Sequence, residues 1–230
     1  MKYFRLLILF IFLFDFAARS QSNDLNLTLD SIFSVDNNNQ RNFTIQYQIK
    51  NKTNKVVSFI LNPNSIRSNV SNALTWSPSY RLYQEETRID AENISSPLTI
   101  EKNNKDFIAK MSKELRDNKQ DLDGYLIKKQ QELKEASSAT IMNSIVTLKP
   151  HESRTYAVSF SWDKNRYVTH FDNEYYLDEK KLHYLDLVII LMKEELYTRL
   201  LPEDQTKIEA NKTIIKGWLN SNKVEINFKE

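Results

Sequence analysis

The chain contains no cysteine. Disulfide bonds are therefore excluded, and so is the acylated cysteine that anchors a bacterial lipoprotein. Exported domains often rely on disulfides when their cores are small. A cysteine-free chain of 230 residues must be held together by core burial, and among exported proteins this favours a bacterial envelope protein.

Glycine is almost as scarce, since only Gly124 and Gly217 occur. Loops that hold phosphate groups need several glycines, because the backbone must approach the ligand closely or adopt positive φ angles. Dinucleotide-binding and P-loop folds are thereby excluded. The two glycines also stand too far apart for the Gly-x-Ser-x-Gly turn of a serine hydrolase. We expect no cofactor.

Long apolar runs are limited to one, at the start of the chain. Lys2 and Arg5 precede the run Leu6–Phe14, and Ala18-Arg19-Ser20 offers a small-x-small cleavage site. Positive charge, run length and cleavage site together predict a secretory signal peptide over residues 1–20. Cleavage at Ser20-Gln21-Ser22 is the alternative.

A later apolar stretch, Leu185–Met192, is interrupted by Asp186 and is too short to span a bilayer. We therefore expect no membrane anchor after signal cleavage.

An excess of either charge is also lacking. The chain has 32 Lys and Arg against 30 Asp and Glu, and without Lys2, Arg5, Arg19 and Asp15 of the leader 29 of each remain. A neutral surface offers no electrostatic footprint for nucleic acid or for anionic lipid. We expect neither as a partner.

Alternating patterns are abundant and predict β-strands. Apolar residues recur at every second position in Leu25–Leu29, Phe43–Ile49, Tyr80–Leu82, Tyr156–Trp162 and Val224–Phe228. This period is typical of strands with one buried face.

Other segments complete the β pattern. Asn51-Lys52-Thr53-Asn54 predicts a turn, so we expect Phe43–Lys50 and Val56–Leu61 to form a hairpin. The apolar run Tyr184–Met192 predicts a central strand covered on both faces. Further strands are expected at Ile145–Leu148 and near Ile214–Leu219, and Pro202 favours a short helix.

A charge-rich segment without proline, from Asn104 to about Ala136, predicts a helical insertion. Its apolar residues follow helical spacing: Ile108, Met111, Leu115, Leu122, Leu126 and Leu133. Gly124, which follows two aspartates closely, leaves one helix or two open. We expect the narrow apolar seam to dock on the rest of the chain rather than to form a partner's groove.

Seven or eight strands with a mid-chain helical block predict a single mainly β domain over residues 21–230, an antiparallel β-sandwich. Phe43–Thr53 with Val56-Val57 resembles the second and third strands of bacterial immunoglobulin-like modules, and Leu148–Tyr156 is similar to a late turn and strand of such modules. The likeness covers about a third of the mature chain, and its motifs occur in many sandwiches. The helical insertion departs from the pattern and leaves the topology open. The resemblance implies an adhesive, inhibitory or chaperone-like binder.

The best candidate for a metal site is an oxygen-rich segment that contains His170, Asp172 and Glu174. Such loops hold hard cations such as Ca²⁺. Its spacing is not that of an EF-hand, whose glycine is missing, and acidic turns are common on surfaces. The histidines also lack the His-x-x-x-His spacing of a helical zinc site. We interpret the segment as a solvated turn and expect no metal.

Tyr175 and Tyr176 form the strongest candidate for a binding contact. Adjacent residues of an extended segment point to opposite faces, so one of the two rings should be exposed. Aromatic side chains are favoured anchors at interfaces.

No catalytic motif is recognisable, which favours a binding protein over an enzyme. We expect a soluble protein, periplasmic or secreted, that binds another envelope protein or a glycan through its loops and helical insertion. The terminal strand Val224–Glu230 favours the periplasm. A hydrolase with a site assembled from dispersed residues is the alternative. A protease inhibitor-like module that exposes Asn62–Pro78 is another.

Overall fold

The computed structural model describes residues 22–38, 40–68, 76–89, 109–110, 112–113, 122–163, 181–192 and 194–228. Their strands and helices are β1 (Leu25–Asn37), β2 (Gln40–Asn51), β3 (Val57–Ile60), β4 (Arg67–Ser68), β5 (Ser79–Gln84), β6 (Thr87–Ile89), α3 (Leu122–Asn143), β7 (Ile145–Leu148), β8 (Ser153–Asp163), β9 (His183–Leu191), α4 (Glu194–Tyr197), α5 (Pro202–Ala210), β10 (Gly217–Asn220) and β11 (Val224–Glu225). The protein is mainly β, as the alternating patterns predict.

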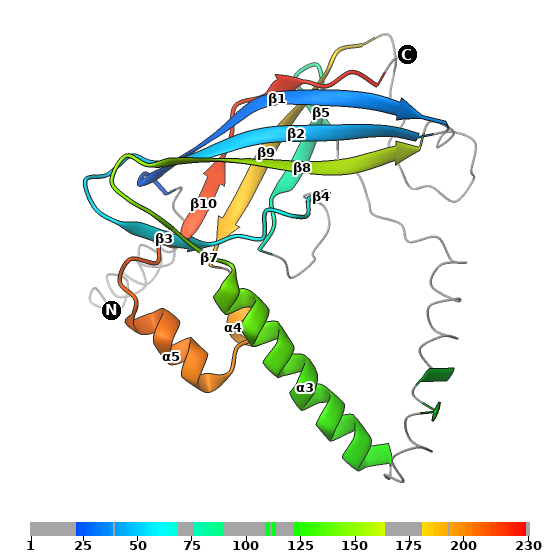
Figure 1. Ribbon diagram of the computed structural model, residues 1–230. Coiled ribbons are helices and arrows are strands. Elements are labelled where there is room, and N and C mark those ends of the chain that lie inside the picture. Colours follow the sequence, from blue (N-terminus) through cyan, green and yellow to red (C-terminus); the bar gives the residue numbers. More distant parts are fainter. Residues whose placement is uncertain are drawn as a thin grey trace, which may run out of the picture.

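Two β-layers face each other across the main core (Figure 1). The first layer has the order β1-β2-β8, and both of its pairings are antiparallel. The second follows the path β10-β9-β5-β4, and β11 and β6 pair with β9 and β5. Its strands are antiparallel except for β4, which runs parallel to β5. A separate antiparallel pair, β3 and β7, leads from the layers to the helices.

The core between the layers is built from the inward positions of the alternating strands. Its fully buried side chains include Phe43, Ile45, Tyr47 and Ile49 of β2 and Leu185, Leu187 and Ile189 of β9. β9 is the central strand that its apolar run predicts, because it pairs with β5 on one side and with β10 and β11 on the other.

At Leu29, the free side of β1 is capped by a side chain instead of a strand. Asn222 accepts a hydrogen bond from the Leu29 backbone N–H (2.9 Å) and donates one to the Leu29 carbonyl (3.0 Å). An unpaired strand edge is a template for pairing with other chains, so this contact blocks further pairing at that point of β1.

The helices form a second, smaller cluster below the layers (Figure 1). Ile141 of α3 packs with Leu196, Leu200 and Ile208 from the α4–α5 segment. The buried Ser138 hydroxyl donates to Asp204 (2.7 Å) and accepts the Leu201 N–H (3.0 Å), so it joins α3 to the start of α5. No helix in the described part of the chain is both long and apolar enough to span a bilayer.

The hairpin expected between Phe43–Lys50 and Val56–Leu61 is wrong. β3 pairs with β7, and β2 lies between β1 and β8. The chain leaves the first layer at Asn51, whose backbone N–H bonds to the Glu152 carbonyl (2.9 Å). A polar turn between two alternating segments indicates a change of direction, but it does not say that the two segments pair.

The predicted end of the helical insertion, near Ala136, is also wrong. α3 continues to Asn143 because its last turns are buried against α4 and α5, where Ser138 and Ile141 are fully covered. The expected docking of the apolar seam is not seen at its described positions. Leu126 is 41% and Leu133 69% exposed. Gly124 lies within α3. Most of the insertion before Leu122 lies outside the described residues, so the choice between one helix and two stays open.

Candidate functional site

The outer face of the first layer carries four consecutive cross-strand rows without a charged side chain. The rows are Thr28–Gln48–Thr155, Ser31–Gln46–Ala157, Phe33–Thr44–Ser159 and Val35–Asn42–Ser161. All of these residues are exposed or half-buried. Charged residues make up 27% of the chain, so twelve accessible positions without one are a departure from its average. We call these twelve residues the uncharged face.

Hydrogen bonds between neighbouring strands hold the polar side chains of the uncharged face in place. The hydroxyls of Thr44 and Ser159 bond to each other (2.9 Å), and Ser161 donates to the Asn42 amide oxygen (2.6 Å). Cross-strand pairs of this kind stabilise a sheet. They also fix the orientation of the donors and acceptors that remain for a ligand.

A register shift adds two apolar side chains to this face. β1 and β2 pair regularly as far as Leu29, and the shift lies between Leu29 and Ser31. Strict alternation from Leu29 would place Phe33 and Val35 inside, but beyond the bulge they point outward and are 54% and 68% exposed. Asp30, the bulge residue, adds one exposed charge at the edge.

The uncharged face suits a neutral polar ligand. Hydroxyl and amide groups both donate and accept hydrogen bonds, and none of them requires a charged partner. Phe33 offers an aromatic surface among them. In the described part of the chain, no group of three or more His, Asp or Glu side chains is placed to hold a metal ion.

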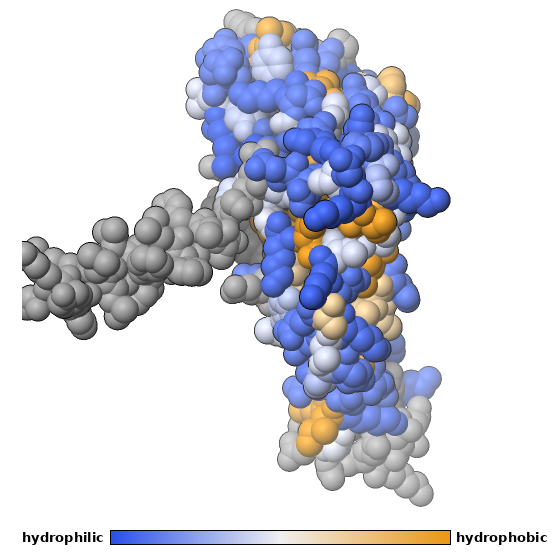
Figure 2. All heavy atoms as spheres, turned by 90° about the vertical axis from the view of Figure 1, so that its left-hand side faces the viewer, coloured by the Kyte–Doolittle hydropathy of each residue, from blue (hydrophilic) through white to orange (hydrophobic). Residues whose placement is uncertain are grey.

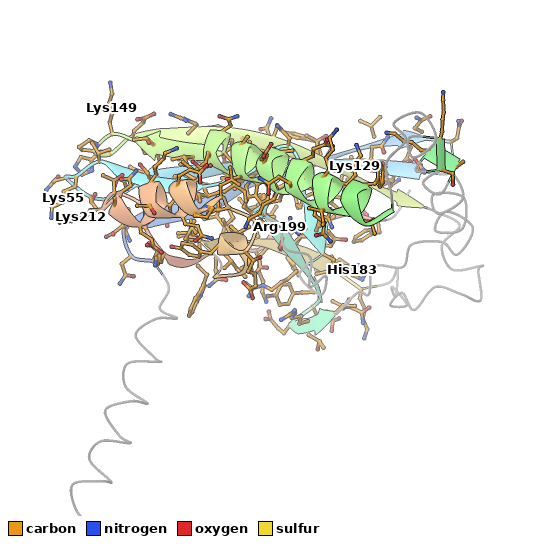
Figure 3. All side chains as sticks on the ribbon, turned by 90° about the horizontal axis from the view of Figure 1, so that it is seen from below. Lys55, Lys129, Lys149, His183, Arg199 and Lys212 are labelled. Carbon is orange, nitrogen blue, oxygen red and sulfur yellow. The ribbon has the colours of Figure 1, made fainter. Side chains whose placement is uncertain are left out.

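The turns at one end of the layers are tied together by Asn51. Its fully buried amide donates to the carbonyls of Lys55 (2.7 Å) and Lys149 (2.9 Å) and accepts the Thr53 N–H (2.9 Å). Lys55, Lys149 and Lys212 lie at this end and point outward (Figure 3). Figure 2 looks onto the same end, which is mainly hydrophilic, with an apolar band where the layers meet the helices. These hydrogen-bonded loops form a basic rim.

A second charged cluster lies on the outer face of the other layer. Arg81 and Asp186 are cross-strand partners, and two hydrogen bonds join them (2.8 and 2.6 Å). The Tyr83 hydroxyl also donates to Asp186 (3.1 Å). The hydrogen bond to Asp186 raises the pKa of Arg81, and burial raises the pKa of Tyr83. All three contacts tie Asp186 to its own sheet, so we interpret the cluster as a structural cross-strand ion pair.

The site residues expected from the sequence lie outside the described residues. This applies to the candidate metal ligands His170, Asp172 and Glu174, to the candidate anchors Tyr175 and Tyr176, and to the signal peptide, residues 1–20. Of the expected inhibitory loop Asn62–Pro78, residues 62–68 and 76–78 are described, and its two ends are joined by a bond between the Ser65 and Ser77 hydroxyls (2.6 Å).

The other two histidines occupy unrelated positions. His151 is exposed and bonds to Asn54 (2.7 Å). His183 is buried edge-on against the Phe228 ring (5.5 Å).

The uncharged face was missed by sequence reasoning, although part of its signal is present. Gln46, Gln48 and Thr155 stand at the outward positions of strands that the alternating pattern predicts correctly. The alternating pattern does not give the order of the strands in the sheet. β2 and β8 lie side by side in the layer although they are more than a hundred residues apart in sequence.

Comparison of the chain with known protein families, with curated proteins and with solved structures found no match.

Proposed function

We propose that this chain is an exported binding protein of the bacterial envelope, periplasmic or secreted, with an immunoglobulin-like sandwich as its scaffold. Its ligand is a neutral glycan that lies across the uncharged face. A protein partner is the other ligand class. The observation that carries the proposal is the set of four uncharged cross-strand rows.

The chemistry of the uncharged face supports a glycan. Sugar hydroxyls both donate and accept hydrogen bonds, as do the Ser, Thr, Asn and Gln side chains of the four rows. Phe33, 54% exposed, offers a ring on which a sugar ring stacks. A charge on either side would be left unpaired after desolvation, so a face without charges selects against charged ligands.

The scaffold part of the proposal is supported by the two antiparallel layers and their common core. The described helix of the insertion, α3, lies between β6 and β7 in chain order and extends away from the first layer (Figure 1). Export is supported by the leader-like residues 1–20. Expression of the full chain and N-terminal sequencing of the product test it, and the expected first residue is Gln21.

Binding is tested on an array of neutral and acidic glycans with the exported protein and two variants. Phe33→Asp places a charge in the uncharged face, and Ile127→Asp makes the same kind of change on α3, where Ile127 is 69% exposed. We expect Phe33→Asp to weaken binding of a neutral glycan about tenfold or more, because the carboxylate loses water without gaining a partner. Ile127→Asp should bind as the unaltered protein does.

Three results would count against this assignment. One is preference for acidic glycans, and another is equal affinity of the two variants. The third is a ligand that proves to be a protein, recovered by both the unaltered protein and Phe33→Asp.

A further inference from the structure

β8 is an edge strand, and the described part of the chain places no device along it that blocks pairing. Within the described part of the chain it pairs with β2 alone, and Figure 1 shows it as the outer strand of its layer. Natural edges are usually protected by lysine, proline or a bulge. From Thr155 to Ser161 the strand contains no charged residue and no proline, and its pairing with β2 is regular over that length.

The sequence of β8 is complementary to itself when it is read in the opposite direction. Around Val158, the residues that would face each other are Ala157 with Ser159, Tyr156 with Phe160, and Thr155 with Ser161. These are a pair of small residues, a pair of aromatic residues and a pair of hydroxyl residues. Aromatic and hydroxyl pairs of this kind stabilise antiparallel strands.

The charge of Arg154 also favours antiparallel pairing of two β8 strands. Arg154, 44% exposed, stands at the beginning of β8. In an antiparallel pair centred on Val158 the two Arg154 side chains lie at opposite ends of the paired segment. A parallel pair would place them side by side, which is unfavourable.

We propose that two copies of this chain pair antiparallel along β8, with Val158 opposite Val158 of the second copy. The two three-stranded layers then form one continuous sheet, and a two-fold axis perpendicular to it keeps both uncharged faces on the same side. Growth through the opposite edge is opposed at Leu29, where Asn222 bonds to both backbone groups. The inference rests on the free edge of β8 and does not depend on the ligand.

The pairing should be reversible on dilution. One strand pair is small beside the roughly 1,200–2,000 Å² that stable interfaces bury. Sedimentation velocity of the full chain, purified after export, should therefore show a monomer–dimer equilibrium that shifts with concentration.

Two double variants test the register. Ala157→Lys with Ser159→Lys places like charges opposite each other in both of the pairs beside Val158, and we expect the dissociation constant to rise about tenfold or more. Ala157→Lys with Ser159→Glu places opposite charges there, and we expect the dimer to be retained or strengthened. Both side chains are exposed, and their partners Gln46 and Thr44 in β2 are neutral. Both variants lose the hydrogen bond between Ser159 and Thr44 and add two charged side chains to the same face. Circular dichroism and thermal unfolding of each variant check that the monomer still folds.

Three results overturn the proposal: a full chain that stays monomeric at every concentration, two double variants that associate equally, or open-ended filaments. An unaltered full chain that binds a neutral glycan but stays monomeric at every concentration would overturn this inference and leave the proposed function standing. An unaltered full chain that dimerises but binds no neutral glycan would do the reverse.

Discussion

Asn222 and Leu29, 193 positions apart, are joined by two hydrogen bonds in which the side-chain amide takes the place of a neighbouring strand. We expect Asn222→Ala to lower the free energy of unfolding by about 1–3 kcal/mol, because two backbone groups of a half-covered strand lose their partners. Asn26→Ala is the control, since among the described residues that side chain bonds to the nearby Thr28 alone. Urea unfolding of both variants measures the difference, and equal losses would contradict the capping role.

Tyr47 carries a hydroxyl that has no hydrogen-bond partner among the described residues, although the residue is completely buried. We expect Tyr47→Phe to leave the free energy of unfolding unchanged or to raise it by about 1 kcal/mol, because an unsatisfied polar group leaves the core. Tyr83→Phe should lower it by about 1 kcal/mol, since that hydroxyl bonds to Asp186. The opposite order of the two variants would show that the Tyr47 hydroxyl has a partner in solution.

The same tyrosine predicts sensitivity to alkali. Burial, and next the charge of Tyr156, raise the pKa of Tyr47 above its ordinary value of 10.0. The folded protein therefore holds this proton more tightly than the unfolded chain does. Its contribution to stability is present below pH 10 and is lost as the pH rises toward the higher folded value. Thermal unfolding between pH 8 and pH 11 should show a steeper decline for the unaltered protein than for Tyr47→Phe.

Asp186 is the buried half of the ion pair with Arg81, and its side chain is 5% exposed. We expect Asp186→Ala to lower the free energy of unfolding by about 2–4 kcal/mol, because the guanidinium group is left without its carboxylate in a mostly covered position. The exposed Glu225 provides the control, and Glu225→Ala should change stability by less than about 0.5 kcal/mol. A change of that small size in Asp186→Ala would mean that the pair is open in solution.

Ser138 links α3 to the start of α5, whereas the neighbouring Ser137 is only half-buried. Ser138→Ala should lower the free energy of unfolding by about 1–3 kcal/mol, because the Leu201 N–H and the Asp204 carboxylate both lose a partner. Ser137→Ala is the control and should have a much smaller effect, since its hydroxyl takes no part in this link. Hydrogen exchange of α5 amides would locate the change, and a loss of protection in β9 instead of α5 would contradict this account.

Low pH should weaken the same contact between Ser138 and Asp204. Hydrogen bonds from Lys207 and Ser138 lower the pKa of Asp204 below its ordinary value of 3.8. The stabilisation is therefore present above that value and is lost as the pH falls through the folded pKa. We expect protection of α5 amides to fall below about pH 4 in the unaltered protein. In Asp204→Asn this step should be absent, and protection should already be lower at neutral pH.

The fold was predictable from the sequence as far as it depends on local alternation. Phe43, Ile45, Tyr47 and Ile49 are all buried, as a period of two requires. The partners of the strands were not predictable, because β3 pairs with β7 across a long intervening segment. The end of α3 depends in the same way on contacts with α4 and α5. Ser138 and Ile141 are buried in those contacts, and local helix propensity does not reveal them.

The uncharged face was predictable only in part. The outward residues Gln46, Gln48 and Thr155 follow from the alternation of the strands. The balance of acidic and basic residues over positions 21–230 predicts a partner other than nucleic acid. Phe33 and Val35 were not predictable as surface residues, because their spacing from Leu29 is that of buried positions. A bulge leaves no mark in composition or periodicity when an ordinary residue such as Asp30 occupies it.

The bulge at Asp30 also has a genetic consequence. Asp30 is the extra residue between Leu29 and Ser31, which face the consecutive residues Tyr47 and Gln46. Loss of the Asp30 codon would therefore give an uninterrupted ladder and leave Phe33 and Val35 on the outer face. Gene copies of different length at this one position would present the same ligand-facing rows.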